Sequence, residues 1–180
     1  MGSENTQAAA RERLYVCLLR TLRSLPAGSA LSLSHPDLPH ARLHPGVTLP
    51  VDYSAARSDD EFFDIAYWVI SGPPEADENY FDLIVGTWDR FGWPTRTGRD
   101  TRPRAAYTRA PDRIGLSVRE SVDGFVSLSG STAPFAVGSA VGRSFPELIE
   151  QPLSMPGGTG SAQDSPGGGG DPRRGPVDPR

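Results

Sequence analysis

The chain has 180 residues, of which 37% are hydrophobic and 22% are charged, and its formal net charge is -4 at pH 7. This length fits one domain, and the negative balance argues against a general affinity for nucleic acid. All 18 basic residues are arginine, and the absence of lysine excludes a Walker A phosphate loop, a Schiff base and a lysine general base.

The first predicted element is a helix over about residues 4–24. Its apolar side chains recur every three or four residues and form one stripe: Leu14, Leu18, Leu22 and Leu25. Pro26 and Gly28 then end the helix. Residues 26–58 are rich in proline and are predicted to be irregular, with short strands at ALSLS and GVTLPVDY.

A strand is predicted over residues 61–71, EFFDIAYWVIS, because this stretch is apolar on both faces, as in a central strand that is covered on both sides. A second helix follows over about residues 75–91, and its apolar face carries Phe81, Ile84, Val85 and Trp88. Gly92 suits the position after the helix, and Pro94 prevents its continuation. A further strand is predicted over residues 105–109.

Residues 113–135, RIGLSVRESVDGFVSLSGSTAPF, predict a β-hairpin whose register follows from its alternating apolar residues. A two-residue turn that ends at Gly124 would place Val118 opposite Ser129 and would separate the two apolar rows. A three-residue loop, with Gly124 in the left-handed conformation, instead pairs Val118 with Leu128. We therefore predict the three-residue loop.

This register gives the two faces of the hairpin a different character. Glu120 lies opposite Val126, and the apolar face carries Leu116, Val118, Val126 and Leu128. The other face is predicted to be exposed to solvent, as is common in antiparallel sheets. It carries Ser117, Arg119, Ser121, Phe125, Ser127 and Ser129.

Together these elements predict an α+β domain in which two helices pack on one face of an antiparallel sheet, in the order helix, strand, helix and β-meander. The domain is predicted to span residues 1–136, with its core in residues 60–135. Residues 137–153 are predicted to be weakly ordered, and the Gly/Pro-rich residues 154–180 are predicted to form a disordered C-terminal tail. No stretch approaches the ~18 apolar residues that a transmembrane segment needs.

The common catalytic motifs are missing from the chain. It has no G-x-S-x-G nucleophile elbow and no dinucleotide-binding fingerprint. The single Cys17 excludes an intramolecular disulfide and a multi-cysteine metal site, and buried packing on the first helix is its favoured role. The acidic residues Asp59, Asp60 and Asp64 leave a carboxylate-based hydrolase open. We predict no catalytic residue and no cofactor.

All three histidines, His35, His40 and His44, lie within HPDLPHARLHP. One interpretation is a metal site, because neutral imidazole is a common ligand and Asp37 is nearby. The alternative is a solvated loop. The loop is favoured, because the prolines prevent a regular helix that would place the imidazoles on one face.

Charge is distributed unevenly along the chain. Residues 58–89 contain nine carboxylates and no arginine, whereas residues 90–119 contain eight arginines and two carboxylates. One interpretation is a basic surface for phosphate or nucleic acid. The favoured one is that acidic residues neutralise arginines on neighbouring strands, because the net charge is negative and no recognition helix carries the arginines. The candidate binding residues are Arg96, Arg99, Arg102, Arg104, Tyr107 and Arg109.

Two segments, NYFDLIVGTWDRFGW and APDRIGLSVRESVDGFVSLSGSTAPF, combine an aromatic helix, a glycine-aromatic turn and a hairpin that closes on a Ser-Gly-Ser motif near a proline. This pattern resembles a family of small actinobacterial proteins of unknown function, many of which are predicted lipoproteins or secreted proteins. Members often have two cysteines, which would suit a disulfide, at places that correspond here to Val51 and to Ala133 or Pro134. The absence of both cysteines from this chain implies a cytoplasmic relative of the family. If the true N-terminus carries an export signal, the alternative is a cell-envelope or secreted protein.

The favoured function is a non-catalytic binding or protein-interaction domain that uses the connection over residues 96–113 or the serine-lined face of the hairpin. One alternative is an envelope-associated carrier of a small molecule or lipid, with its ligand between the sheet and Phe81, Ile84 and Trp88. The third hypothesis is a hydrolase whose catalytic carboxylates form no recognisable sequence motif. A protein is the expected partner, nucleic acid is not expected, and the oligomeric state is left open.

Overall fold

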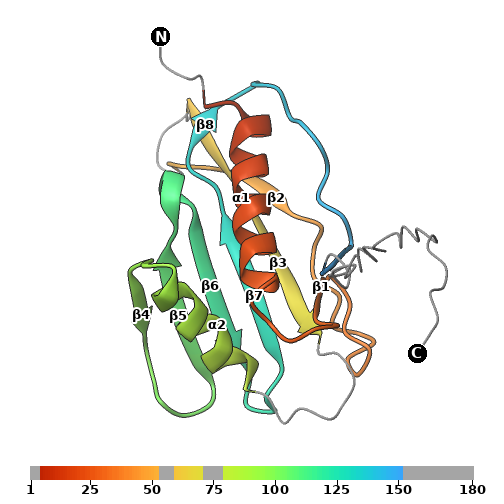
Figure 1. Ribbon diagram of the computed structural model, residues 1–180. Helices are drawn as coiled ribbons and strands as arrows, with labels where there is room; N and C mark the ends of the chain where they lie inside the picture. Colours follow the sequence, from red (N-terminus) through yellow and green to blue (C-terminus); the bar gives the residue numbers. More distant parts are fainter. Residues whose placement is uncertain (1–4, 53–58, 71–78, 152–180) are drawn as a thin grey trace, which may run out of the picture.

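The computed structural model describes residues 5–52, 59–70 and 79–151. In these residues two α-helices pack on one face of a nine-stranded antiparallel sheet (Figure 1). The predicted α+β class is therefore confirmed. The predicted tail, residues 154–180, lies outside the described residues, and neither described helix has the length and hydropathy needed to cross a bilayer.

The sheet is built around the long strand β3 (Asp60–Ile70). Its main path follows the order β4-β5-β6-β7-β3-β1-β9, while β2 and β8 pair with the first part of β3. The other strands are β1 Ala30–Ser32, β2 Val47–Pro50, β4 Thr95–Thr97, β5 Arg104–Arg109, β6 Gly115–Glu120, β7 Val126–Ser131, β8 Phe135–Ala136 and β9 Leu148–Glu150. Strands β1, β2 and β5 lie where the sequence predicts short strands.

Helix α1 (Gln7–Leu22) begins at a side-chain cap that the sequence supplies. The hydroxyl of Thr6 accepts a hydrogen bond from Ala9 N at 3.2 Å, which satisfies one of the free amides of the first turn. The predicted apolar stripe is the face that packs on the sheet, and its side chains are at most 5% exposed: Leu14, Leu18, Leu22 and Leu25. The helix is two residues shorter at its C-terminal end than the predicted 4–24.

Helix α2 (Tyr80–Arg90) is capped by Asn79, whose Oδ1 accepts from Asp82 N at 3.2 Å. Gly92 has a φ of 71°, the left-handed conformation predicted for the residue that ends this helix. The predicted start at residue 75 lies outside the described residues.

The hairpin of β6 and β7 has the predicted register. Val118 lies opposite Leu128, and both side chains are fully buried. Gly124 has a φ of 88°, and its N–H donates to Ser121 O at 3.1 Å, which closes the three-residue loop. Register and loop type therefore follow from the alternation and from one glycine.

Strand β3 is covered on its two faces by different parts of the chain. Ile65 and Tyr67 are fully buried on the face that carries the helices. On the other face Trp68 is half-buried, because the proline-rich segment packs against it: Trp68 Nε1 donates to Ala41 O at 2.6 Å, and the His35 ring meets it edge-on. The C-terminal end of β3, which carries Trp68, is therefore covered on both faces, as the sequence predicts.

Residues 137–151 run beside α1 and then return to the sheet (Figure 1). Ala140 O accepts from Ala8 N at 2.7 Å at the start of the helix, and Tyr67 Oη donates to Pro146 O at 2.8 Å. Strand β9 then pairs with β1. This segment, for which the sequence predicts weak order, thus adds an edge strand and a wall beside α1.

Candidate functional site

We call the side of β3, β5, β6 and β7 that faces away from α1 and α2 the open face (Figure 1). Strand pairing arranges its side chains in rows that cross the sheet. One row consists of Tyr107, Ser117, Ser129 and Ala66, and the next consists of Ala105, Arg119, Ser127 and Trp68. Small residues therefore form the middle of the open face, and larger aromatic and charged side chains stand around them.

A shallow pocket of about 490 Å³ lies on the open face beside the hairpin loop. Its lining includes Trp68, Arg99, Tyr107, Arg119, Phe125 and Ser127. Tyr107 is 50% exposed, whereas Phe125 is held by an edge-on contact with His35, with ring centroids 5.0 Å apart. Exposed aromatic rings beside guanidinium groups are typical of binding surfaces, since both residue types are enriched at binding hot spots.

Four exposed arginines surround this pocket or extend the same face. Arg96 lies opposite Tyr107, Arg109 is on the same face of β5, Arg119 is on β6, and Arg99 lines the pocket. Within the described residues no carboxylate oxygen lies within 4.0 Å of any of these four guanidinium groups. Three of these arginines and Tyr107 are candidate binding residues, so four of the six candidates lie on this face: Arg96, Arg99, Tyr107 and Arg109.

The other two candidates, Arg102 and Arg104, bind a buried carboxylate. Arg102 Nε donates to Glu120 Oε1 at 2.9 Å, and Arg104 Nε donates to Glu120 Oε2. Arg104 also donates to Asp82 Oδ1 at 2.9 Å, at the start of α2. These two guanidinium groups are thus neutralised by carboxylates on a neighbouring strand and helix, which is the role that the charge pattern favours.

Asp64 lies on the open face opposite Ser131. Burial raises the pKa of its carboxyl group above the ordinary 3.8, and the positive charges of His44 and Arg119 oppose this shift. Asp60 is exposed at the start of the same strand, and a rise of ~3.3 Å per residue puts the two backbones roughly 13 Å apart. Their side chains lie on the same face of β3, four residues apart, and the hydrolase hypothesis stays a prediction.

The three histidines have separate surroundings. His35 packs against Trp68 and Phe125, whereas His40 is exposed. His44 Nδ1 accepts from the backbone N–H of residue 46 at 3.1 Å. Across the described ranges, no group of three or more His, Cys, Asp and Glu side chains is placed to hold a metal ion.

The aromatic side chains of α2, which the carrier hypothesis invokes, are part of the core. Phe81, Ile84 and Trp88 are at most 3% exposed. Trp88 Nε1 donates to Thr21 Oγ1 of α1 at 3.1 Å, which satisfies its polar atom inside the core. These side chains fill the space between α2 and the sheet.

The candidate residues chosen from the sequence omit Trp68 and Arg119. Arg119 could be found from the hairpin register, because it lies on the same face as Ser127 and opposite Ala105. Trp68 carries no such local signal, since its strand partner Ser127 is distant in the sequence.

Comparisons with protein-family models, with curated proteins and with solved structures found no match for this chain. The resemblance to small actinobacterial proteins therefore stays a prediction.

Proposed function

We propose that this protein is a non-catalytic interaction domain whose open face binds an acidic segment of a partner protein. The supporting observation is a group of exposed arginines that have no carboxylate partner among the described residues and that lie on the face of an aromatic pocket: Arg96, Arg99, Arg109 and Arg119. A guanidinium group without an internal partner is available for the paired hydrogen bonds that carboxylates accept.

The middle of the open face supports an extended segment as the bound form. Ser117, Ser127 and Ser129 are small and half-buried, so a chain can lie close to the sheet. Their hydroxyl groups can both donate and accept hydrogen bonds. Tyr107 and Trp68 provide apolar contact at the two sides of this floor.

The charge of the whole chain favours a short acidic partner over a nucleic acid. The formal net charge of -4 repels a long polyanion, whereas a short acidic segment interacts mainly with the local arginines. Nucleic-acid affinity also depends on neutralising many phosphates at once. The proposed partner is therefore a protein.

The direct test is the fluorescence anisotropy of a labelled short polyglutamate peptide with the full chain at low and high salt. The combined variant Arg96→Gln, Arg109→Gln, Arg119→Gln should lower the affinity at least about tenfold, since each exposed ion pair contributes ~0.5 kcal/mol. A matched control, Arg13→Gln, Arg23→Gln, Arg90→Gln, removes the same charge from the helix side and should leave the affinity within about twofold.

Three results would overturn the proposal. The first is no binding of polyglutamate to the wild-type chain at low salt. The second is an equal loss of polyglutamate affinity in both combined variants, which would mean that binding depends only on the net charge of the protein. The third is tighter binding of a single-stranded oligonucleotide of the same length than of polyglutamate.

A further inference from the structure

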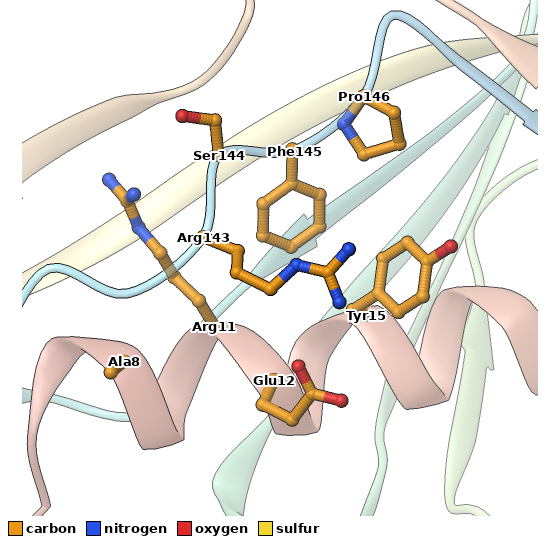
Figure 2. A pocket seen from close by; sticks show the side chains of 8 residues that line it. All are labelled: Ala8, Arg11, Glu12, Tyr15, Arg143, Ser144, Phe145 and Pro146. Carbon is orange, nitrogen blue, oxygen red and sulfur yellow. The ribbon is translucent and has the colours of Figure 1, made fainter.

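A second pocket, of about 160 Å³, lies on the helix side of the protein, away from the open face. Its walls are one side of α1 and residues 143–146 of the segment that runs beside the helix (Figure 2). Arg11 and Tyr15 come from successive turns of α1, while Arg143 and Phe145 come from the facing segment. Two guanidinium groups and two aromatic rings thus line one small space.

Arg11 carries the most informative atom of this pocket. Among the buried side-chain nitrogen and oxygen atoms of the described residues, Arg11 Nε alone has no hydrogen-bond partner. Its guanidinium carbon lies 4.2 Å from the centroid of the Phe63 ring, so one face of the group is occupied by an aromatic side chain. A buried donor without an acceptor is costly, so the Arg11 side chain has a hydrogen-bonding capacity that the described residues do not satisfy.

The charge of the pocket also lacks a built-in partner. Neither Arg11 nor Arg143 makes an ion pair with a described carboxylate. In Figure 2 the Arg11 guanidinium extends toward Ser144, and the Arg143 guanidinium lies between the Phe145 and Tyr15 rings, above Glu12. Glu12 is the one carboxylate in the lining, against two guanidinium groups, so the lining as a whole is positive.

Aromatic rings define the shape that fits beside these charges. The Phe145 ring stacks on Phe63 with centroids 5.2 Å apart and meets Tyr15 edge-on at 5.9 Å. The volume is close to that of an engineered cavity of ~150 Å³ that binds benzene. The space therefore suits one planar ring, and the guanidinium groups suit an anionic group attached to it.

We propose that the pocket between α1 and residues 143–146 is a binding site for a small aromatic carboxylate, whose carboxylate is held by Arg11 and Arg143 and whose ring packs against Tyr15 and Phe145. The site is independent of the open face, which lies on the other side of the sheet. Loss of one binding activity therefore leaves the other intact.

Isothermal titration calorimetry of the full chain with benzoate tests this site. Benzoate should bind, and benzyl alcohol, which has the same ring without the charge, should bind at least about tenfold more weakly, since it lacks the charge-assisted hydrogen bonds. Arg11→Gln and Arg143→Gln should each lower benzoate affinity by about tenfold or more. Arg23→Gln, at the far end of α1, is the control for charge alone and should leave the affinity unchanged. Glu12→Gln should tighten binding, because it removes a negative charge from the pocket wall.

Several outcomes would overturn the assignment. Equal binding of benzoate and benzyl alcohol would show that the guanidinium groups do not take part. Tighter binding of inorganic phosphate than of benzoate would show that the aromatic rings of the pocket do not take part in binding. An unchanged affinity in Arg143→Gln would also count against it, and this exposed position keeps the test valid if Arg11→Gln does not fold. A chain that binds no benzoate at all lacks the proposed site, whatever its behaviour toward polyglutamate.

Discussion

Glu120 and Arg104 lie directly opposite each other on strands β6 and β5, and the Glu120 side chain is only 2% exposed. Arg104 links this buried carboxylate to Asp82 at the start of α2, and Arg102 reaches the same carboxylate from the connection before β5. A buried carboxylate is tolerated when it is paired and hydrogen-bonded. Arg104 therefore links α2 to the sheet, and Arg102 links the 98–103 connection to it.

The first prediction concerns this ion pair. Glu120→Gln should lower the free energy of unfolding by roughly 2–4 kcal/mol, because it removes the buried carboxylate and leaves the largely buried Arg104 with Asp82 as its remaining carboxylate partner. The matched control is Glu147→Gln, which breaks an exposed pair with Arg42 and should cost less than ~1 kcal/mol. Urea unfolding of both variants is the measurement. Equal losses would show that burial adds nothing to the Glu120 pair.

The hairpin and helices show which parts of this fold local sequence could predict. The pairing of Val118 with Leu128 follows from alternation and from the single loop conformation that Gly124 supports. The end of α2 at Gly92 follows from backbone chemistry in the same way. These features depend on residues that are close in the sequence, so the pattern alone determines them.

Features that depend on distant pairing were not accessible in the same way. Strand β9 is three residues long and becomes a strand because β1 is available to pair with it. The sequence predicts that Arg104 lies in a connection, because the predicted strand begins at residue 105. Its position on β5, on the opposite face to Arg109, explains why its guanidinium group binds Glu120 and Asp82. Arg104 and Glu120 also contribute to the lining of the pocket on the open face.

The second prediction compares two glycines. A Cβ atom at Gly130 would lie 2.4 Å from Leu14 Cδ1, in the fully buried contact between β7 and α1. Gly130→Ala should therefore cost about 1–3 kcal/mol through overpacking. At Gly86 in α2 the nearest atom to such a Cβ is Arg90 Nη1 at 3.7 Å, so Gly86→Ala should stabilise the protein by about 0.5–1 kcal/mol. Thermal unfolding of the two variants should give shifts of opposite sign, and a shift of the same sign would contradict this packing.

The third prediction concerns the pH dependence of stability through Asp64. Burial raises the pKa of this carboxyl group in the folded state, so the folded protein holds the proton more tightly than the unfolded chain does. Asp64 therefore destabilises the fold at neutral pH, and this penalty is lost as the pH falls toward the ordinary carboxyl value of 3.8. Asp64→Asn should be more stable than wild type at neutral pH, with a difference that narrows in acid. Urea unfolding across this range measures it, and a difference that widens in acid would mean that the pKa is lowered.

The last prediction concerns Cys17 on α1. Its side chain is 8% exposed, and burial raises the pKa of the thiol from 9.0 to about 11, with a smaller contribution from Asp112. Because the thiolate is the reactive form, the higher pKa lowers its fraction about 100-fold, and the greater nucleophilicity of a more basic thiolate offsets part of this loss. The native thiol should therefore react with a disulfide reagent roughly tenfold more slowly than the unfolded chain at mildly alkaline pH, from the pKa difference alone. Limited access should slow the reaction further. The rates in buffer and in concentrated urea give the comparison, and a native rate equal to the unfolded rate would place Cys17 at the surface and would contradict the packing of α1 on the sheet.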